Sequence, residues 1–163
     1  LEHATDMDDE TIKMMVQKGI YYVSTIDHNQ YYYEHNDEYQ FPAGSKENLA
    51  DYIQRNFETA KKAFKAGAKL VVGSDAVYTG FEKDMMREMT WYVKLGMTNE
   101  QALQAATTVP AEMLGMGKSL GGVAPGFFAD IVALDGDPLA DINVVLNKVR
   151  WVMKGGQVVV DKK

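Results

Sequence analysis

The sequence predicts an α/β protein in which short parallel strands alternate with helices and a small antiparallel sheet follows. The first observation is that β-rich runs at 20–25 and 69–74 are each followed by residues with helical spacing. The second is that these runs are short and apolar, which is typical of parallel strands buried on both faces. The third is a pair of β-rich runs within 149–160, separated by Gly155 and Gly156, which predicts a hairpin.

The N-terminal part is expected to hold two of the parallel strands with a helix between them. Residues 1–3 form the end of the first strand in this prediction, and residues 20–25 form the second. The helix begins near Asp8, because a cluster of acids favours the positive end of the helix dipole, and Gly19 ends it. Its apolar stripe consists of Ile12, Met15 and Val16.

The middle of the chain is predicted to hold a loop, a long helix and the third parallel strand. Residues 26–44 are polar and aromatic, and we expect a long loop there. Ser45 then caps a helix that runs to Gly67, and residues 69–74 form the strand. The apolar positions of the helix are Leu49, Ile53, Phe57, Ala60 and Phe64.

Three further helices are predicted before Gly121, where the sequence changes from helical patterns to β-rich runs. One runs from about Asp84 to Leu95, with Met85, Met89, Tyr92 and Val93 on one face. Thr98 and Gln101 have the spacing of a capping box and open the second. Pro110 suits the first turn of the third.

The region after Gly121 is expected to form a separate β-rich domain, with the boundary between 1–120 and 121–163. Residues 124–126 (Ala-Pro-Gly) predict a turn, and 127–134 a strand that joins the hairpin of 149–160. These strands are too few for an independent sandwich, so they require partners from elsewhere.

Composition excludes several function classes. The 163 residues carry a net charge of -6, which argues against a nucleic-acid partner, and no apolar run approaches the ~20 residues of a membrane span. The chain contains no cysteine, which excludes thiol catalysis and disulfides but does not distinguish cytoplasm from periplasm. We predict a cytoplasmic protein without nucleic-acid or membrane partners.

Two residues at predicted strand ends are candidates for chemistry. Asp75 follows the buried run that ends in Gly73 and Ser74, and His3 lies at the end of the first strand. Functional groups of parallel α/β folds gather at the carboxyl ends of strands. Taken alone, Asp75 is more often the cap of a turn and His3 more often a partly buried histidine, so the two residues carry weight only together.

Three segments together resemble the amidohydrolase superfamily, in its Xaa-Pro dipeptidase and imidazolonepropionase branch. The segment "LEHATDMDDETIKMMVQKGIYYVSTI" resembles the region around the sixth barrel strand, and "VVGSDA" the eighth strand. The tail "LGMTNEQALQAATTVPAEMLGMGKSLGGVAPGFFADIVALDGDPL" is similar to the family's helix pair, Gly-rich turn and accessory strand. The resemblance implies strands six to eight of a distorted TIM (β/α)8 barrel, plus part of an accessory β-sandwich.

The resemblance also implies a divalent metal, one or two ions and most simply Zn²⁺. By motif His3 and Asp75 are metal ligands, and Asp75 is also the catalytic residue that relays a proton from water to the leaving amine. The family's other ligands, on strands one to five, are not in this chain. We therefore expect the C-terminal part of a longer enzyme, inactive alone and completed by a chain carrying those strands, or paired with itself as a homo-oligomer.

The predicted loop after the second strand is expected to help select the substrate. In the family this loop overhangs the metals, and here it offers His28, Tyr31, Tyr33 and His35 as substrate-binding residues. The alternative is a surface loop whose tyrosines only pack against a neighbour. One departure is that Gly80 follows Thr79 where many relatives have His-Gly, so a substrate contact from that histidine is missing.

Three functions stay open on the sequence alone. The first is hydrolysis of the amide bond of a dipeptide or an N-acyl amino acid. The second is an imidazolonepropionase or aromatic-deaminase type of reaction on a cyclic C–N bond. The third is a non-catalytic relative or a fragment that acts as a structural module. The presence of both His3 and Asp75 argues against a degenerate relative, but not against a fragment.

Overall fold

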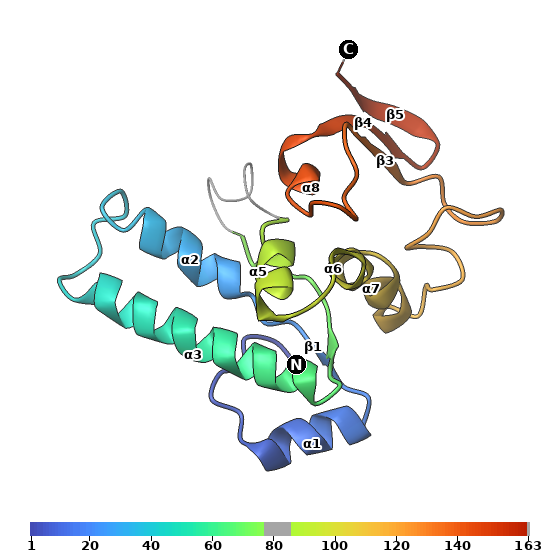
Figure 1. Cartoon of the computed structure of the whole chain (residues 1–163). Coiled ribbons are helices and arrows are strands. Elements are labelled where there is room, and N and C mark those ends of the chain that lie inside the picture. The colour runs from blue at the N-terminus through green and yellow to red at the C-terminus, as the bar shows by residue number, and fades with distance from the viewer. Residues whose placement is uncertain (77–85, 163) are drawn as a thin grey trace. The chain divides into compact units, whose positions relative to one another are not determined.

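The chain forms two compact units, Leu1–Gly96 and Met97–Lys163. The structure is a computed structural model that describes residues 1–76 and 86–162 (Figure 1). The domain boundary expected between residues 120 and 121 concerns the complete protein and stays a prediction.

Parallel strands lie at the centre of the first unit. Strand β1 (Tyr21–Tyr22) pairs in parallel with β2 (Lys69–Leu70), and Glu2 forms a parallel bridge with Val23. The peptide N–H of His3 donates to the carbonyl of Val23 at 3.0 Å, while the N–H of Val71 donates to the carbonyl of Tyr22 at 2.9 Å. Tyr22 and Val23 therefore bond to opposite neighbours, and β1 lies between residues 1–3 and β2. The predicted parallel pairing is confirmed.

The regular strands are shorter than the predicted runs of 20–25 and 69–74. Thr25 has a φ of 51°, and this left-handed residue turns the chain out of β1 and into a helix. Extended pairing cannot continue through such a residue, because its backbone leaves the plane of the sheet.

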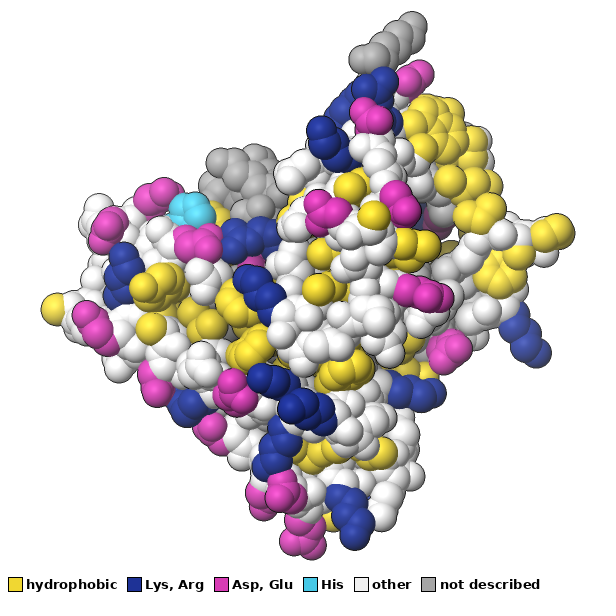
Figure 2. Space-filling view, viewed as in Figure 1, with side chains coloured by type: hydrophobic (Ala, Val, Ile, Leu, Met, Phe, Trp, Pro, Cys, Tyr) yellow, Lys and Arg dark blue, Asp and Glu magenta, His cyan; other side chains and the backbone are white. Residues whose placement is uncertain are grey.

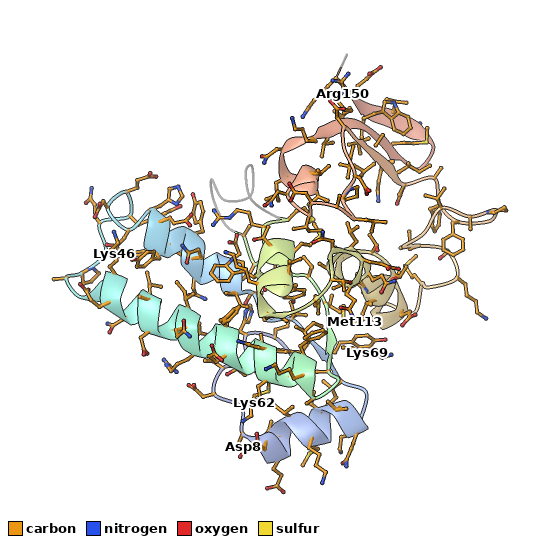
Figure 3. All side chains as sticks on the ribbon, viewed as in Figure 1. Asp8, Lys46, Lys62, Lys69, Met113 and Arg150 are labelled. Atoms are coloured by element: carbon orange, nitrogen blue, oxygen red, sulfur yellow. The ribbon has the colours of Figure 1, made fainter. Side chains whose placement is uncertain are left out.

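Helix α1 (Asp9–Gln17) begins and ends as predicted. The Asp8 carboxylate accepts a hydrogen bond from the Thr11 N–H at 2.8 Å, and Gly19 takes a φ of 63° just after the helix. Ile12 and Met15 are buried. Figure 3 labels Asp8 at this helix start, close to Lys62 of α3 (Ser45–Lys65), whose ammonium pairs with Asp9.

The prediction of a loop over 26–44 is wrong for its first half, because residues Ile26–Glu34 form helix α2. The polar composition hid this helix, whose buried residues include only Ile26, Asp27 and Tyr31. The residue that precedes the helix, Thr25, makes no side-chain hydrogen bond that caps its N-terminus. The helix is instead stabilised by tertiary contacts, and Figure 1 shows it side by side with α3.

Helix α3 confirms the long helix predicted over 45–67 but not its cap. The N-cap position is Gly44, with a φ of 85°, and Ser45 is the first helical residue. Its buried face includes Ile53 and Ala60, as the apolar spacing predicted. Helix α5 (Glu88–Leu95) ends at Gly96 as expected, while residues 84 and 85 of the predicted helix, like Thr79 and Gly80, lie outside the described residues.

The surface over the C-terminal half of α3 mixes charges of both signs. Figure 2 shows dark-blue basic side chains beside magenta acidic ones where α1 and the end of α3 lie. The Arg55 guanidinium pairs with Asp6 and, at 2.8 Å, with Asp51. Among the described residues, no helix is both long and apolar enough to cross a bilayer.

The second unit contains helices followed by the predicted antiparallel sheet. Helix α6 (Asn99–Ala106) begins with the Thr98–Gln101 capping box, and Pro110 lies in the first turn of α7 (Thr108–Met113). The strands pair in the order β3-β4-β5. Their bounds, with one short helix before β4, are β3 (Ile131–Leu134), α8 (Val144–Asn147), β4 (Val149–Lys154) and β5 (Gln157–Asp161).

Two details of this sheet refine the prediction. The hairpin turns at Gly155 and Gly156 as expected, but β3 begins at Ile131 and not at residue 127. Phe127 closes a turn, because its N–H donates to the carbonyl of Ala124, and the N–H of Phe128 donates to the carbonyl of Ser119, outside the sheet. That this sheet forms part of a sandwich stays a prediction.

Asp130 ties the turn before β3 to the hairpin. Its carboxylate accepts hydrogen bonds from the Gly155 N–H at 2.7 Å and from the Lys154 ammonium at 2.9 Å. The bond from the Gly155 N–H, followed by the one from Lys154, lowers the pKa of Asp130 below its usual value. The carboxylate is therefore the form that holds the hairpin in place.

Candidate active site

Three left-handed residues mark the carboxyl ends of the parallel strands in the first unit. His3, Thr25 and Asp75 have φ values of 57°, 51° and 45°. Such conformations in non-glycine residues cost about 1–3 kcal/mol each and cluster at functional sites. The predicted ligands His3 and Asp75 thus lie at the ends of the two segments that flank β1, and Thr25 lies at the end of β1 itself.

The segment that leads to Asp75 passes very close to β1. A Cβ atom placed on Gly73 would lie 2.4 Å from Cγ1 of Val23 and 3.9 Å from Cγ2 of Thr25. Real Cβ contacts do not occur at 2.4 Å, so only glycine fits here unless Val23 moves. Gly73 therefore lets the segment that leads to Asp75 pass close beside β1 and its C-terminal end.

We expect Gly73→Ala to destabilise the first unit by about 1–3 kcal/mol, the usual cost of overpacking. The cost arises at Val23, so the double variant Gly73→Ala, Val23→Ala should recover part of it relative to the sum of the single changes. The measurement is a double-mutant cycle of unfolding free energies in urea. Strict additivity of the two substitutions would contradict the close approach.

His3 is held by its backbone and by one ring nitrogen. Its N–H donates to the Val23 carbonyl, and its own carbonyl accepts from the Tyr52 hydroxyl at 3.3 Å. The ring Nδ1 lies 2.7 Å from Oγ1 of Thr25. The other nitrogen, Nε2, lies 4.0 Å from a carboxylate oxygen of Glu2, and 47% of the side chain is exposed.

The structure brings one predicted substrate-binding residue to Asp75. Nδ1 of His28, on α2, lies 2.7 Å from the Asp75 carbonyl oxygen and 3.4 Å from its carboxylate. The Asp75 side chain is 46% exposed, so the carboxylate keeps access to solvent beside this imidazole.

The other predicted substrate-binding residues lie on α2 or just after it, in two different surroundings. Tyr31 is buried and stacks on His35 with ring centroids 4.2 Å apart, and its hydroxyl accepts from Tyr39 at 3.4 Å. Tyr33 faces elsewhere, with the ammonium of Lys46 5.3 Å from its ring centre. The substrate contacts of Tyr31, Tyr33 and His35 stay predictions.

Glu88 is a buried residue of this region that was not among the predicted site residues. It is fully buried at the start of α5, and its carboxylate accepts from the Ser24 hydroxyl at 2.6 Å. It also accepts from the N–H groups of Ile26 at 3.0 Å and Asp27 at 2.8 Å. A distant carboxylate thus caps α2 and holds the residues on both sides of Thr25.

Burial raises the pKa of Glu88 to about 7, even though the bonds from Ser24, Asp27 and Ile26 favour the charged form. The same burial raises the pKa of Tyr92, whose hydroxyl donates to the Val71 carbonyl at 2.8 Å. A signal was present in the sequence, because Glu88 lies four residues before Tyr92 on the apolar face of the predicted helix. A charged residue on the apolar face of a helix indicates that its side chain is buried and bonds to polar groups in the core.

A second carboxylate fastens the first turn of α2 to α5. Asp27 is buried and accepts from the Trp91 indole N–H at 2.9 Å, and the Arg87 Nε lies 3.2 Å from it. Arg87 also reaches Glu34 at the other end of α2, at 2.9 Å. These contacts position α2, and with it His28, beside the ends of the strands.

The candidate ligands have the chemistry that a zinc-type ion prefers. One imidazole nitrogen and one carboxylate, both partly exposed at the ends of the two segments that flank β1, are typical members of a catalytic zinc site. Such a site usually has three protein ligands. Within residues 1–76 and 86–162, no group of at least three His, Cys, Asp or Glu residues is arranged to hold a metal ion.

Known proteins resemble this chain over nearly its whole length. It is 30% identical over 161 residues to ochratoxinase from Aspergillus niger, across 96% of this chain and 33% of that protein. A solved structure of a prolidase complexed with N-methylphosphonate-L-proline superposes with a TM-score of 0.89 at 32% identity, over 99% of this chain and 40% of that one. A Xaa-Pro dipeptidase with bound methionine in its active site gives a TM-score of 0.84 at 31% identity, over 98% and 39%.

This chain spans about one third of the length of the curated ochratoxinase and about two fifths of the solved structures that it matches. The sequence model of the amidohydrolase family matches residues 1–159. The chain belongs to the amidohydrolase family.

Proposed function

We propose that this chain forms the C-terminal part of a metal-dependent amidohydrolase that cleaves the amide bond of a dipeptide or an N-acyl amino acid. The observation that carries the proposal is the placement of His3 and Asp75 at the ends of the two segments that flank β1. The similar proteins include a prolidase and a Xaa-Pro dipeptidase, which supports the choice of substrate class.

His3 and Asp75 would hold the metal, most simply Zn²⁺, through an imidazole nitrogen and a carboxylate oxygen. The metal, when bound, supplies Lewis acidity and makes water a better nucleophile at neutral pH. Asp75 accepts the proton of the attacking water and donates it to the nitrogen of the leaving amine. The half-exposed carboxylate can carry out both transfers because it faces solvent and lies next to His28.

His28 is the side chain best placed to contact the substrate. Its ring lies against both the carbonyl and the carboxylate of Asp75, so a group bound at Asp75 also meets the imidazole edge. The T-shaped contact with Tyr32, at 5.0 Å between ring centres, supports the ring from one side. A substrate carboxylate or carbonyl would accept a hydrogen bond here.

The remaining metal ligands would come from barrel strands one to five, outside this chain. In this proposal the segments at 1–3, 21–23 and 69–71 are strands six to eight of a distorted (β/α)8 barrel, and the β3-β4-β5 sheet completes an accessory sandwich. The shares of the relatives that this chain covers, 33% and 40%, suit a C-terminal part of such an enzyme.

The experiment that tests the proposal is an assay of the complete protein against Xaa-Pro dipeptides and N-acyl amino acids. We expect turnover that disappears on treatment with a chelator and returns with Zn²⁺. A metal-independent turnover, or cleavage of cyclic C–N substrates alone, would contradict it. In the same assay, we expect no turnover from this chain by itself and recovery when a segment with strands one to five is added.

A further inference from the structure

The Thr25 hydroxyl lies at the end of β1 and contacts only one of the two candidate ligands, His3. We propose that Thr25 is a positioning residue that fixes the His3 ring as the Nδ1–H tautomer and so presents Nε2 as the ligating nitrogen. The assignment of a ligand role to Nε2 rests on the proposed function, whereas the tautomer does not.

The direction of the hydrogen bonds follows from the groups involved. Oγ1 of Thr25 lies 2.8 Å from the carbonyl oxygen of Ser24, which can only accept, so the hydroxyl proton is donated there. Oγ1 must then accept from Nδ1 of His3 at 2.7 Å. A neutral imidazole with its proton on Nδ1 has a lone pair on Nε2, which is the form that binds a metal.

The Ser24 carbonyl, which accepts the Thr25 proton, is held in place by a second hydrogen bond. It also accepts from the amide nitrogen of Asn56 at 2.9 Å, and Asn56 is completely buried. A carbonyl oxygen has two lone pairs, so the bonds from Asn56 and Thr25 are compatible. With this acceptor in place, the Thr25 proton points away from His3.

Thr25 itself has little freedom to turn. Only 3% of its surface is exposed, its backbone is left-handed, and its branched side chain restricts χ1. Glu88 binds the residues on both sides of it, through the Ser24 hydroxyl and the Ile26 N–H. A rigid acceptor is what a histidine ligand needs for a defined ring orientation.

The opposite nitrogen of His3, Nε2, lies 4.0 Å from the exposed carboxylate of Glu2. Nearly half of the His3 side chain is exposed, and within the described part of the chain no hydrogen bond forms to Nε2. Metal-ligating histidines usually donate their other ring N–H to a protein acceptor, and loss of that acceptor costs about 10–100-fold in metal affinity. Thr25 occupies the place of that acceptor.

The test reads the tautomer directly, in the complete metal-free protein with ¹⁵N-labelled histidine. The ring resonances of His3 are assigned by their loss in His3→Gln, and spectra are recorded near pH 8.5, above the ordinary histidine range of about 6.5. We expect the Nδ1–H pattern in the wild type and in Thr25→Ser, which keeps the hydroxyl. In Thr25→Val, which keeps the shape and loses the hydroxyl, the pattern should shift toward Nε2–H.

Metal affinity gives a second, independent reading. We expect Thr25→Val to weaken Zn²⁺ binding by about 10–100-fold and Thr25→Ser to change it far less. The matched control is Thr90→Val on α5, where the lost hydroxyl donates to the Arg87 carbonyl, remote from His3. This control should leave both the His3 spectrum and the affinity unchanged.

An Nε2–H pattern in the wild type would overturn the proposal, as would an unchanged Nδ1–H pattern in folded Thr25→Val. If Thr25→Val does not fold, the wild-type and Thr25→Ser spectra still decide. Because the spectra need neither metal nor substrate, an expected tautomer in a protein without hydrolase activity would refute the proposed function alone.

Discussion

Replacing Glu88 by Ala is expected to destabilise the protein by at least about 3 kcal/mol, because three buried donors lose their acceptor at about 1–3 kcal/mol each. These donors are the Ser24 hydroxyl and the N–H groups of Ile26 and Asp27. The carboxylate is fully buried, so these donors bond to it away from bulk solvent. The measurement is the free energy of unfolding in urea at pH 7.

The matched control is Glu58→Ala, an exposed glutamate of α3 that accepts from Gln54 at 3.2 Å. A surface substitution of this kind changes stability by less than about 0.5 kcal/mol. Equal effects of the two substitutions would contradict the role of Glu88 as a tertiary cap of α2.

The raised pKa of Glu88 gives the same prediction a pH dependence. Its folded pKa of about 7 lies above the value of 4.5 for an unperturbed glutamate, so the folded state binds more protons between these values. The contribution of this group to stability is therefore complete below about pH 4.5 and is lost as the pH rises toward 7. Glu88→Gln should therefore remove the loss of stability between pH 4.5 and 7. If the loss persists in Glu88→Gln, another group causes it.

Asp75→Asn is expected to lower kcat/KM of the complete enzyme by about 10²–10⁴-fold, the usual contribution of a general acid–base group. The amide cannot accept the proton of water, and its oxygen is a weaker metal ligand than a carboxylate. Asparagine tolerates the left-handed backbone at φ 45°, so the fold should persist, which alanine would not guarantee. The measurements are steady-state kinetics and the bound metal content.

Asp135→Asn serves as the control for this substitution. Asp135 is 65% exposed and lies 3.7 Å from Arg150 in the second unit. Its loss should leave the kinetics unchanged. Full activity of Asp75→Asn with normal metal content would remove Asp75 from the mechanism.

Local sequence signals determined much of this fold. The Asp8 cap of α1, the Thr98–Gln101 capping box and the Gly155-Gly156 hairpin turn each depend on residues that are neighbours along the chain. Their physics is local, so the pattern predicts them directly. The parallel pairing followed from strand–helix alternation, and the motifs at His3 and Asp75 identified the strand ends where both residues lie.

Only the tertiary structure decided how those strand ends are organised. Helix α2 was predicted as a loop because its cap is the carboxylate of Glu88, 62 residues away from Ile26 along the chain. Thr25 was not predicted as a site residue from the sequence, because its hydroxyl contacts His3 only after another strand brings His3 beside it. Hydrogen bonds between distant residues leave no periodic pattern, because a local spacing carries no record of which chain segments meet in the folded core.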